Sequence, residues 1–218
     1  MHAFILAGGF ATRLWPLTEH RAKPLLPLAG VPLISQIVEK IPTDIPVTVS
    51  TNAAFIGSFE EWRLGMHREN LTVIAEPAMH DDRKLGTNGA IALWIKEHKI
   101  HDDVLLLTGD NYLGFSIQDF LASYKGYTLL AAFDVGSLEE AKKFGTVLLA
   151  EDGSSVTGFE EKPSQPKTTL ASTGCSIIPA SLLNIVQDYA AEHPDHIGGI
   201  FEEFLRRGVK IECFHFTE

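Results

Sequence analysis

Cysteine and long apolar runs are both scarce in this sequence. Its two cysteines, Cys175 and Cys213, cannot build a disulfide framework, so we expect both thiols in the core of a cytoplasmic protein. No run approaches the ~18 apolar residues that a membrane helix needs, and we expect no membrane partner. The apolar residues 1–7 meet Gly8-Gly9 without a preceding basic region, so we expect no signal peptide.

Positive charge is scarce as well. The chain has 18 Lys and Arg against 28 Asp and Glu, a formal net charge of −10, and no Lys/Arg-rich run. Nucleic-acid-binding proteins display a basic face, so we expect no nucleic acid as partner. A small polyanion remains allowed, because a few well-placed cations can hold it locally.

Short apolar runs alternate with amphipathic stretches through the N-terminal half. Four of the runs predict buried parallel strands: residues 2–7, 46–50, 71–75 and 103–108. Between them apolar residues recur at helical spacing, as at Ile117, Phe120 and Leu121. Strand and helix in alternation predict a parallel sheet covered on both faces.

The pattern changes after Tyr127. Residues 144–150 and 155–161 flank Asp152-Gly153, a combination that predicts an antiparallel hairpin. Three further strands are predicted at 128–133, 169–178 and 209–216. No linker or repeat interrupts the chain. We therefore expect a single α/β domain over 1–218, with three α/β/α layers, a Rossmann-like and mostly parallel central sheet, and an inserted antiparallel hairpin.

A glycine turn with nearby cations follows the first predicted strand. Gly8-Gly9 lets the backbone approach a ligand and present N–H groups to phosphate oxygens. Arg13 offers a planar fork for phosphate and Lys23 a compact charge, at the sheet edge where open α/β folds bind ligands. The turn has neither the G-x-G-x-x-G spacing of dinucleotide-binding proteins nor a P-loop. The alternative is a plain strand-to-helix turn with solvated cations.

The longer string around this turn resembles the signature of the nucleotide-sugar pyrophosphorylases, the sugar-1-phosphate nucleotidyltransferases. Its matching elements are L-A-G-G at 6–9, T-R-L at 12–14, P-L-T at 16–18 and K-P-L-L-P at 23–27. The resemblance covers residues 3 to about 215. It implies an NTP-binding loop made by Leu6, Ala7, Gly8 and Gly9. Arg13 and Lys23 would bind the NTP and act catalytically, stabilising the α-phosphate and the departing pyrophosphate.

A second segment of the resemblance ends in Gly109-Asp110-Asn111 after an apolar run. In the family the aspartate of this segment binds magnesium, which implies Mg²⁺ as cofactor and Asp110 as metal ligand, catalytic residue and NTP-binding residue. The residue type agrees, since a hard divalent ion prefers carboxylate and phosphate oxygens. Without the first motif, Asp110 would be interpreted as a turn or helix-cap residue.

The predicted hairpin resembles the sugar-phosphate-binding segment of the same family. Gly145 and Glu161 match residues that contact sugar hydroxyls, and Lys162 matches the lysine that pairs with the sugar phosphate. Gly174 matches the next strand of that pocket. A carboxylate accepts hydrogen bonds from hydroxyls and a lysine neutralises phosphate, so the residue types fit. The alternative is a solvated Glu-Glu-Lys strand end.

Gly86, Thr87 and Asn88 match the family's base-reading loop in position. The resemblance implies NTP contact there, mostly through backbone groups, whereas Thr87 or Asn88 as a helix N-cap would explain the residues without a ligand. Residues 193–196 predict a surface turn rather than a metal site. Residues 81–84 predict a solvated loop of mixed charge.

These matches together predict transfer of a nucleotidyl group from an NTP to a sugar 1-phosphate, giving an NDP-sugar and pyrophosphate, as in the EC 2.7.7 class. Residues 1–125 would bind the NTP and residues 126–218 the sugar phosphate. A catalytically silent homologue that binds a nucleotide sugar and regulates a partner is the main alternative, although the retained charges weigh against it. A dinucleotide-binding dehydrogenase is the third alternative, and the absence of the G-x-G-x-x-G motif from the sequence disfavours it.

The base and the sugar stay open at this point, as does the oligomeric state, which allows a homo-oligomer. Pro24 stands where rhamnose-pathway thymidylyltransferases typically have glutamine, which disfavours dTTP without selecting another base. The family also places a second metal-binding aspartate in a segment resembling W-x-D-x-G after the last strand. The sequence ends at Glu218 before such a segment. We therefore expect a chain shortened at its C-terminus that binds NTP but turns over slowly.

Overall fold

One mixed sheet organises the chain. In chain order its strands are β1 (His2–Leu6), β4 (Val47–Asn52), β5 (Leu71–Glu76), β6 (Val104–Thr108), β7 (Thr128–Asp134), β8 (Gly145–Leu149), β9 (Val156–Glu161), β10 (Leu170–Ile178) and β11 (Ile211–Phe216). In the computed structural model, which describes residues 1–77 and 85–217, these nine strands have the main order β11-β7-β10-β6-β1-β4-β5. β8 joins through β10, and β9 pairs with β8. The residues predicted as a mixed-charge loop, 81–84, lie outside the described residues, as does Glu218.

The pairing follows the predicted division of the chain. β6, β1, β4 and β5 are parallel, as are β11 and β7, while β10 lies antiparallel between β6 and β7. The hairpin β8–β9 is antiparallel and turns at Asp152, whose Oδ1 accepts the backbone N–H groups of Ser154 and Ser155 at 2.8 and 2.7 Å. The prediction of a mostly parallel, Rossmann-like sheet with an inserted antiparallel hairpin is therefore confirmed.

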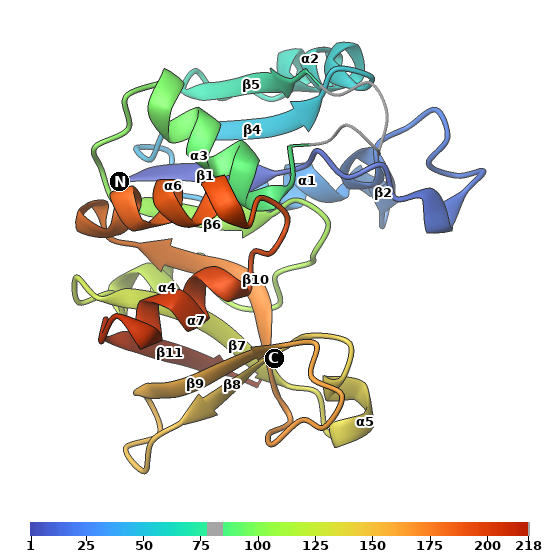
Figure 1. Cartoon of the computed structure of the whole chain (residues 1–218). Helices are drawn as coiled ribbons and strands as arrows, with labels where there is room; N and C mark the ends of the chain where they lie inside the picture. Colours follow the sequence, from blue (N-terminus) through green and yellow to red (C-terminus); the bar gives the residue numbers. More distant parts are fainter. Residues whose placement is uncertain (78–84, 218) are drawn as a thin grey trace.

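Helices cover both faces of the sheet (Figure 1). One face carries α1 (Leu33–Lys40), α2 (Ile56–Gly65) and α4 (Ile117–Ala122). The other carries α3 (Thr87–Glu97), α6 (Leu183–Glu192) and α7 (Gly199–Arg206). β1 separates the two cores, because Ala3 and Ile5 face the first group of helices and Phe4 stacks on Trp94 of the second at 4.3 Å. A short α5 (Leu138–Ala141) and a two-stranded ribbon, β2 (Pro27–Leu28) with β3 (Val31–Pro32), lie outside these layers.

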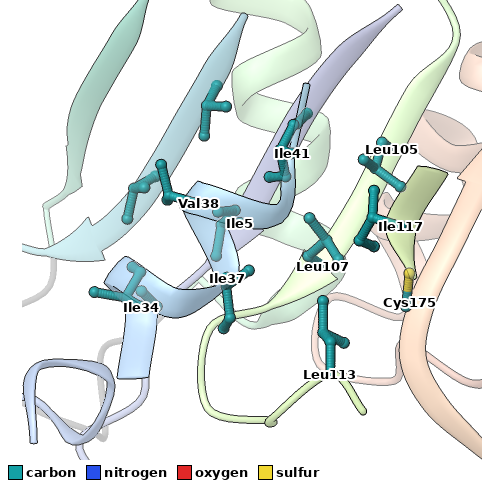
Figure 2. Packing of buried hydrophobic residues seen from close by; sticks show 14 of the residues in the cluster. Ile5, Ile34, Ile37, Val38, Ile41, Leu105, Leu107, Leu113, Ile117 and Cys175 are labelled. Atoms are coloured by element: carbon teal, nitrogen blue, oxygen red, sulfur yellow. The ribbon is translucent and has the colours of Figure 1, made fainter. Parts of the chain in front are cut away.

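The first core shows why α1 forms although the sequence analysis did not predict it. Its apolar residues Ile34, Ile37 and Val38 have helical spacing and are at most 1% exposed. Figure 2 shows them directed toward the sheet, near Ile5 and Leu107. The helix has only eight residues, so packing rather than length stabilises it.

Both cysteines belong to the core, as predicted. Cys175 is 1% and Cys213 8% exposed, and both are free thiols. Burial raises the pKa of both thiols, that of Cys213 to about 12, so neither is a reactive thiolate at neutral pH. Within residues 1–77 and 85–217, no helix combines the length and apolarity needed to cross a membrane.

Candidate active site

A cavity of about 580 Å³ opens at the carboxyl ends of the parallel strands, within the size range of small-molecule sites. The residues predicted to bind NTP line it, with the exception of Asn88: Leu6, Ala7, Gly8, Gly9, Arg13, Lys23, Gly86, Thr87 and Asp110. Parallel pairing explains this convergence, because β1, β5 and β6 all end at the same edge of the sheet.

Neighbouring strands fix the glycine turn after β1. The Asn52 side chain, at the end of β4, donates Nδ2–H to the Gly8 carbonyl at 3.0 Å and accepts the Phe55 backbone N–H at 3.1 Å. Asn52 is fully buried, and the backbone N–H of Ala7 bonds to Ser50. Asn52 was not predicted as part of the site. Its hydrogen bond fixes the position of the Gly8 backbone from the neighbouring strand β4.

The loop after the glycines presents Arg13 to solvent at the cavity. Arg13 lies on a short 3₁₀ helix, Thr12–Leu14, that begins after Ala11 in the left-handed region with φ 48°. The buried hydroxyl of Thr18 donates to the Ala11 carbonyl at 2.8 Å. The loop is thus braced internally while the guanidinium stays exposed and available to an anion.

Lys23 and Asp110 meet directly at this cavity. Lys23 Nζ lies 2.8 Å from Asp110 Oδ2, and their side chains are 35% and 45% exposed. An exposed ion pair of this kind contributes little to stability, typically ~0–1 kcal/mol. It can therefore open when an anion offers Lys23 a stronger partner, and until then it keeps Lys23 beside Asp110.

A second, smaller cavity of about 250 Å³ lies beside the first. All four residues predicted to bind the sugar phosphate line it: Gly145, Glu161, Lys162 and Gly174. Lys162 Nζ is 3.6 Å from Glu161 Oε1, and the Lys162 side chain is 66% exposed. Thr108, the last residue of β6, lines both cavities. The two cavities are therefore adjacent, with Thr108 between them.

Comparison with known proteins agrees with this arrangement. Residues 2–218 match the model of a family described as nucleotidyl transferase. The chain belongs to this family.

The relatives of this nucleotidyl transferase include proteins whose names contain a sugar 1-phosphate. A glucose-1-phosphate adenylyltransferase of Thermomicrobium roseum is 31% identical over 97% of the chain and 54% of its own length. The bifunctional protein GlmU of Methanocaldococcus jannaschii is 26% identical over 98% of the chain and 50% of its own length. The chain thus spans about half the length of these curated relatives. A Bacillus anthracis structure, assigned as a glucose-1-phosphate thymidylyltransferase and solved with sucrose, has the same fold, with a TM-score of 0.83 at 23% identity over 100% of this chain and 87% of that one.

The residues around Asp110 fit a magnesium ion that relies on substrate for most of its ligands. Among residues 1–77 and 85–217, no three His, Cys, Asp or Glu side chains gather into a metal site. Mg²⁺ is commonly held in proteins by one or two carboxylates together with waters and substrate phosphates. The partly exposed Asp110 carboxylate at the cavity edge matches that requirement, and its Oδ2 already attracts a cation, Lys23.

The predicted base-reading loop has a different arrangement from the expected one. α3 begins after Gly86 without a side-chain cap, and the Pro194 carbonyl accepts the backbone N–H groups of Asn88 and Gly89 at 2.8 and 3.1 Å. The N-cap alternative for Thr87 or Asn88 is therefore wrong. Asn88 Nδ2 donates to the His193 and His196 carbonyls, and the residue is 1% exposed. The Asn88 side chain thus joins two distant segments of the chain, and Asn88 is not among the residues that line the cavity.

Two further parts of the cavity were missed. Residues 193–196 are an exposed turn, as predicted, yet Asp195 lines the first cavity and Gly198 the second. Glu76, the last residue of β5, also lines the first cavity and is only 7% exposed. In the sequence, no motif distinguishes Asp195 or Glu76 from an ordinary surface charge.

Proposed function

We propose that this nucleotidyl transferase joins the nucleotidyl group of an NTP to a sugar 1-phosphate and releases pyrophosphate. The observation that carries the proposal is the wall shared by the two cavities at Thr108. An NTP in the first cavity and a sugar phosphate in the second would meet at the end of β6, beside Asp110. The nature of the linings supports the same assignment, since the first has Arg13 and Lys23 for a triphosphate and the second has Lys162 for a monoester.

The reaction needs positioning and charge neutralisation more than covalent chemistry. A phosphate oxygen of the sugar 1-phosphate attacks the α-phosphorus of the NTP as the bond to pyrophosphate breaks. Lys162 would hold the attacking phosphate, and Arg13 and Lys23 would neutralise the charge that develops on the departing pyrophosphate. Mg²⁺ held by Asp110 would supply Lewis-acid polarisation of the phosphates. Glu161 would orient the sugar by accepting hydrogen bonds from its hydroxyls.

A product assay tests the proposal. The purified chain is incubated with Mg²⁺ and a panel of five NTPs against several sugar 1-phosphates, and pyrophosphate release is followed by a coupled pyrophosphatase assay. Release that requires both substrates and disappears in Arg13→Ala supports the proposal. Saturable binding of an NDP-sugar without release under any pairing would instead favour the silent regulatory homologue.

A further inference from the structure

Glu76 is a buried carboxylate in the nucleotide cavity that the proposed mechanism does not use. It ends β5, is 7% exposed, and its Oε1 accepts the Ser50 hydroxyl at 3.2 Å. A Cβ atom at Gly8 would lie 2.7 Å from Glu76 Oε1. The carboxylate is therefore packed directly against the backbone of Gly8, the first residue of the glycine turn, in a space that only glycine leaves open at position 8.

Burial disfavours the charged form of the Glu76 carboxylate, and its hydrogen bonds offset this desolvation cost only in part. Desolvation raises the pKa of Glu76, hydrogen bonds from Ser50 and from the Leu85 backbone lower it, and the charge of Asp195 raises it further. Carboxylates whose pKa is perturbed by burial are concentrated at functional sites. A ligand that donates hydrogen bonds to Glu76 would offset the remaining cost of burying its charge.

The position of Glu76 assigns it to the base end of an NTP. Along the sheet, β5 lies three strands from β6, roughly 14 Å at the usual ~4.8 Å strand spacing. Lys23 and Asp110 meet at the β6 side, where the cations would draw the phosphates. A carboxylate repels a triphosphate, so the β5 side of the cavity suits the uncharged base.

We propose that Glu76 reads the Watson–Crick edge of guanine and makes GTP the preferred nucleotide. This inference rests on the proposed function. Guanine presents two adjacent donors on that edge, N1–H and the 2-amino group, and an ionised carboxylate presents two acceptors and no donor. The match gives a bidentate, charge-assisted pair.

The other bases fit the carboxylate less well. Uracil and thymine place a carbonyl oxygen on each side of their single N–H, and each oxygen would face Glu76 with an unmatched lone pair. Adenine and cytosine offer an amino donor next to a ring nitrogen that is itself an acceptor. The loss of a hydrogen bond to buried Glu76 should strongly disfavour these bases relative to guanine, because no water replaces the missing donor.

Nucleotide binding by isothermal titration calorimetry tests the inference on the wild-type chain alone. The nucleotides are GTP, ITP, ATP, UTP, CTP and dTTP, each titrated without sugar phosphate. ITP is the critical probe, since it differs from GTP only in lacking the 2-amino group. We expect GTP to bind about 10- to 100-fold tighter than ITP, the range of one good bidentate base contact.

Glu76→Gln provides the matching variant. A glutamine offers one acceptor and one donor, so the GTP:ITP preference should fall toward one. XTP carries an oxygen in place of the 2-amino group and presents a donor beside an acceptor, so its affinity should rise at least ~10-fold in this variant. Glu97→Gln, exposed at the end of α3, is the control and should leave all ratios unchanged.

The outcomes separate this inference from the proposed function. Tight binding of another NTP with weak GTP binding, or equal GTP and ITP affinities in the wild type, would overturn the guanine assignment and leave nucleotidyl transfer standing. A uniform loss of all NTPs in Glu76→Gln, with the GTP:ITP ratio preserved, would assign Glu76 to ribose and overturn it too. Failure of every NTP to bind the wild type would overturn both.

Discussion

Lys23 Nζ and Asp110 Oδ2 lie 2.8 Å apart although 87 residues separate them in the chain. One follows the glycine turn of β1 and the other follows β6, and the parallel pairing of these two strands brings them together. The pair places a cationic side chain suited to phosphate and an anionic side chain suited to a metal ion at a single point of the cavity. Replacing Lys23 and replacing Asp110 should therefore affect activity in different ways.

Asp110→Asn should reduce kcat by ~10²-fold and raise the Mg²⁺ concentration needed for half-maximal activity. The amide keeps the size of the side chain but loses the negative charge that a divalent ion requires. NTP binding in the absence of Mg²⁺ should stay within a few-fold of wild type. Steady-state rates across a Mg²⁺ titration measure this, with Asp188→Asn on the exposed side of α6 as control. An unchanged Mg²⁺ requirement would contradict the role given to Asp110.

Arg13→Ala should lower turnover by at least ~10²-fold and leave the fold intact. The guanidinium is exposed, and within residues 1–77 and 85–217 it makes no hydrogen bond or ion pair, so its charge is needed chiefly when pyrophosphate departs. Initial rates at saturating substrates, with far-UV circular dichroism, provide the measurement. Arg63→Ala, which removes an ion pair with Glu60 on α2, is the matched control. Near-wild-type kcat in Arg13→Ala would remove Arg13 from the mechanism.

Lys162→Ala should raise KM for the sugar 1-phosphate much more than KM for the NTP. The reason is its place in the second cavity, outside the lining of the first. Lys167→Ala, on the same loop and paired with Glu160, is the control. A rise confined to the NTP KM would mean that the hairpin contacts the other substrate.

Gly174→Ala should destabilise the protein more than Gly153→Ala. Both glycines have left-handed backbone, with φ of 71° and 70°, so each substitution carries the same backbone cost of about 1 kcal/mol. A Cβ at Gly174 would also lie 2.7 Å from Thr108 Oγ1, whereas one at Gly153 meets nothing within 4 Å. The overlap should cost about 1–3 kcal/mol more. Urea unfolding of the two variants compares them directly, and equal midpoints would show that Thr108 moves aside.

The fold and most of the cavity lining followed from local sequence features. Apolar runs predicted the strands, and residues directly after buried strands, such as Gly8 and Asp110, had to meet at one edge of the sheet. The hairpin could be predicted in the same way, because Asp152-Gly153 forms the turn between its two strands. These features depend on neighbours in the chain, so they are visible in a single sequence.

The features that were missed depend on contacts between distant segments. The Pro194 carbonyl caps α3 across more than a hundred residues of chain, and a backbone carbonyl has no signature in the sequence. Glu76 resembles any polar residue at a strand end until the fold buries it against Gly8. Asn88 matched a motif position, but its amide is used within the structure.

The origin of the bridging oxygen tests nucleotidyl transfer most directly. A sugar 1-phosphate labelled with ¹⁸O on its phosphate is incubated with the chain, Mg²⁺ and an NTP, and the products are separated and weighed by mass spectrometry. Attack by the sugar phosphate on the α-phosphorus predicts an NDP-sugar that keeps all of the label, formed in equal amount with unlabelled pyrophosphate. Labelled inorganic phosphate, or release of NMP in place of an NDP-sugar, would contradict the account.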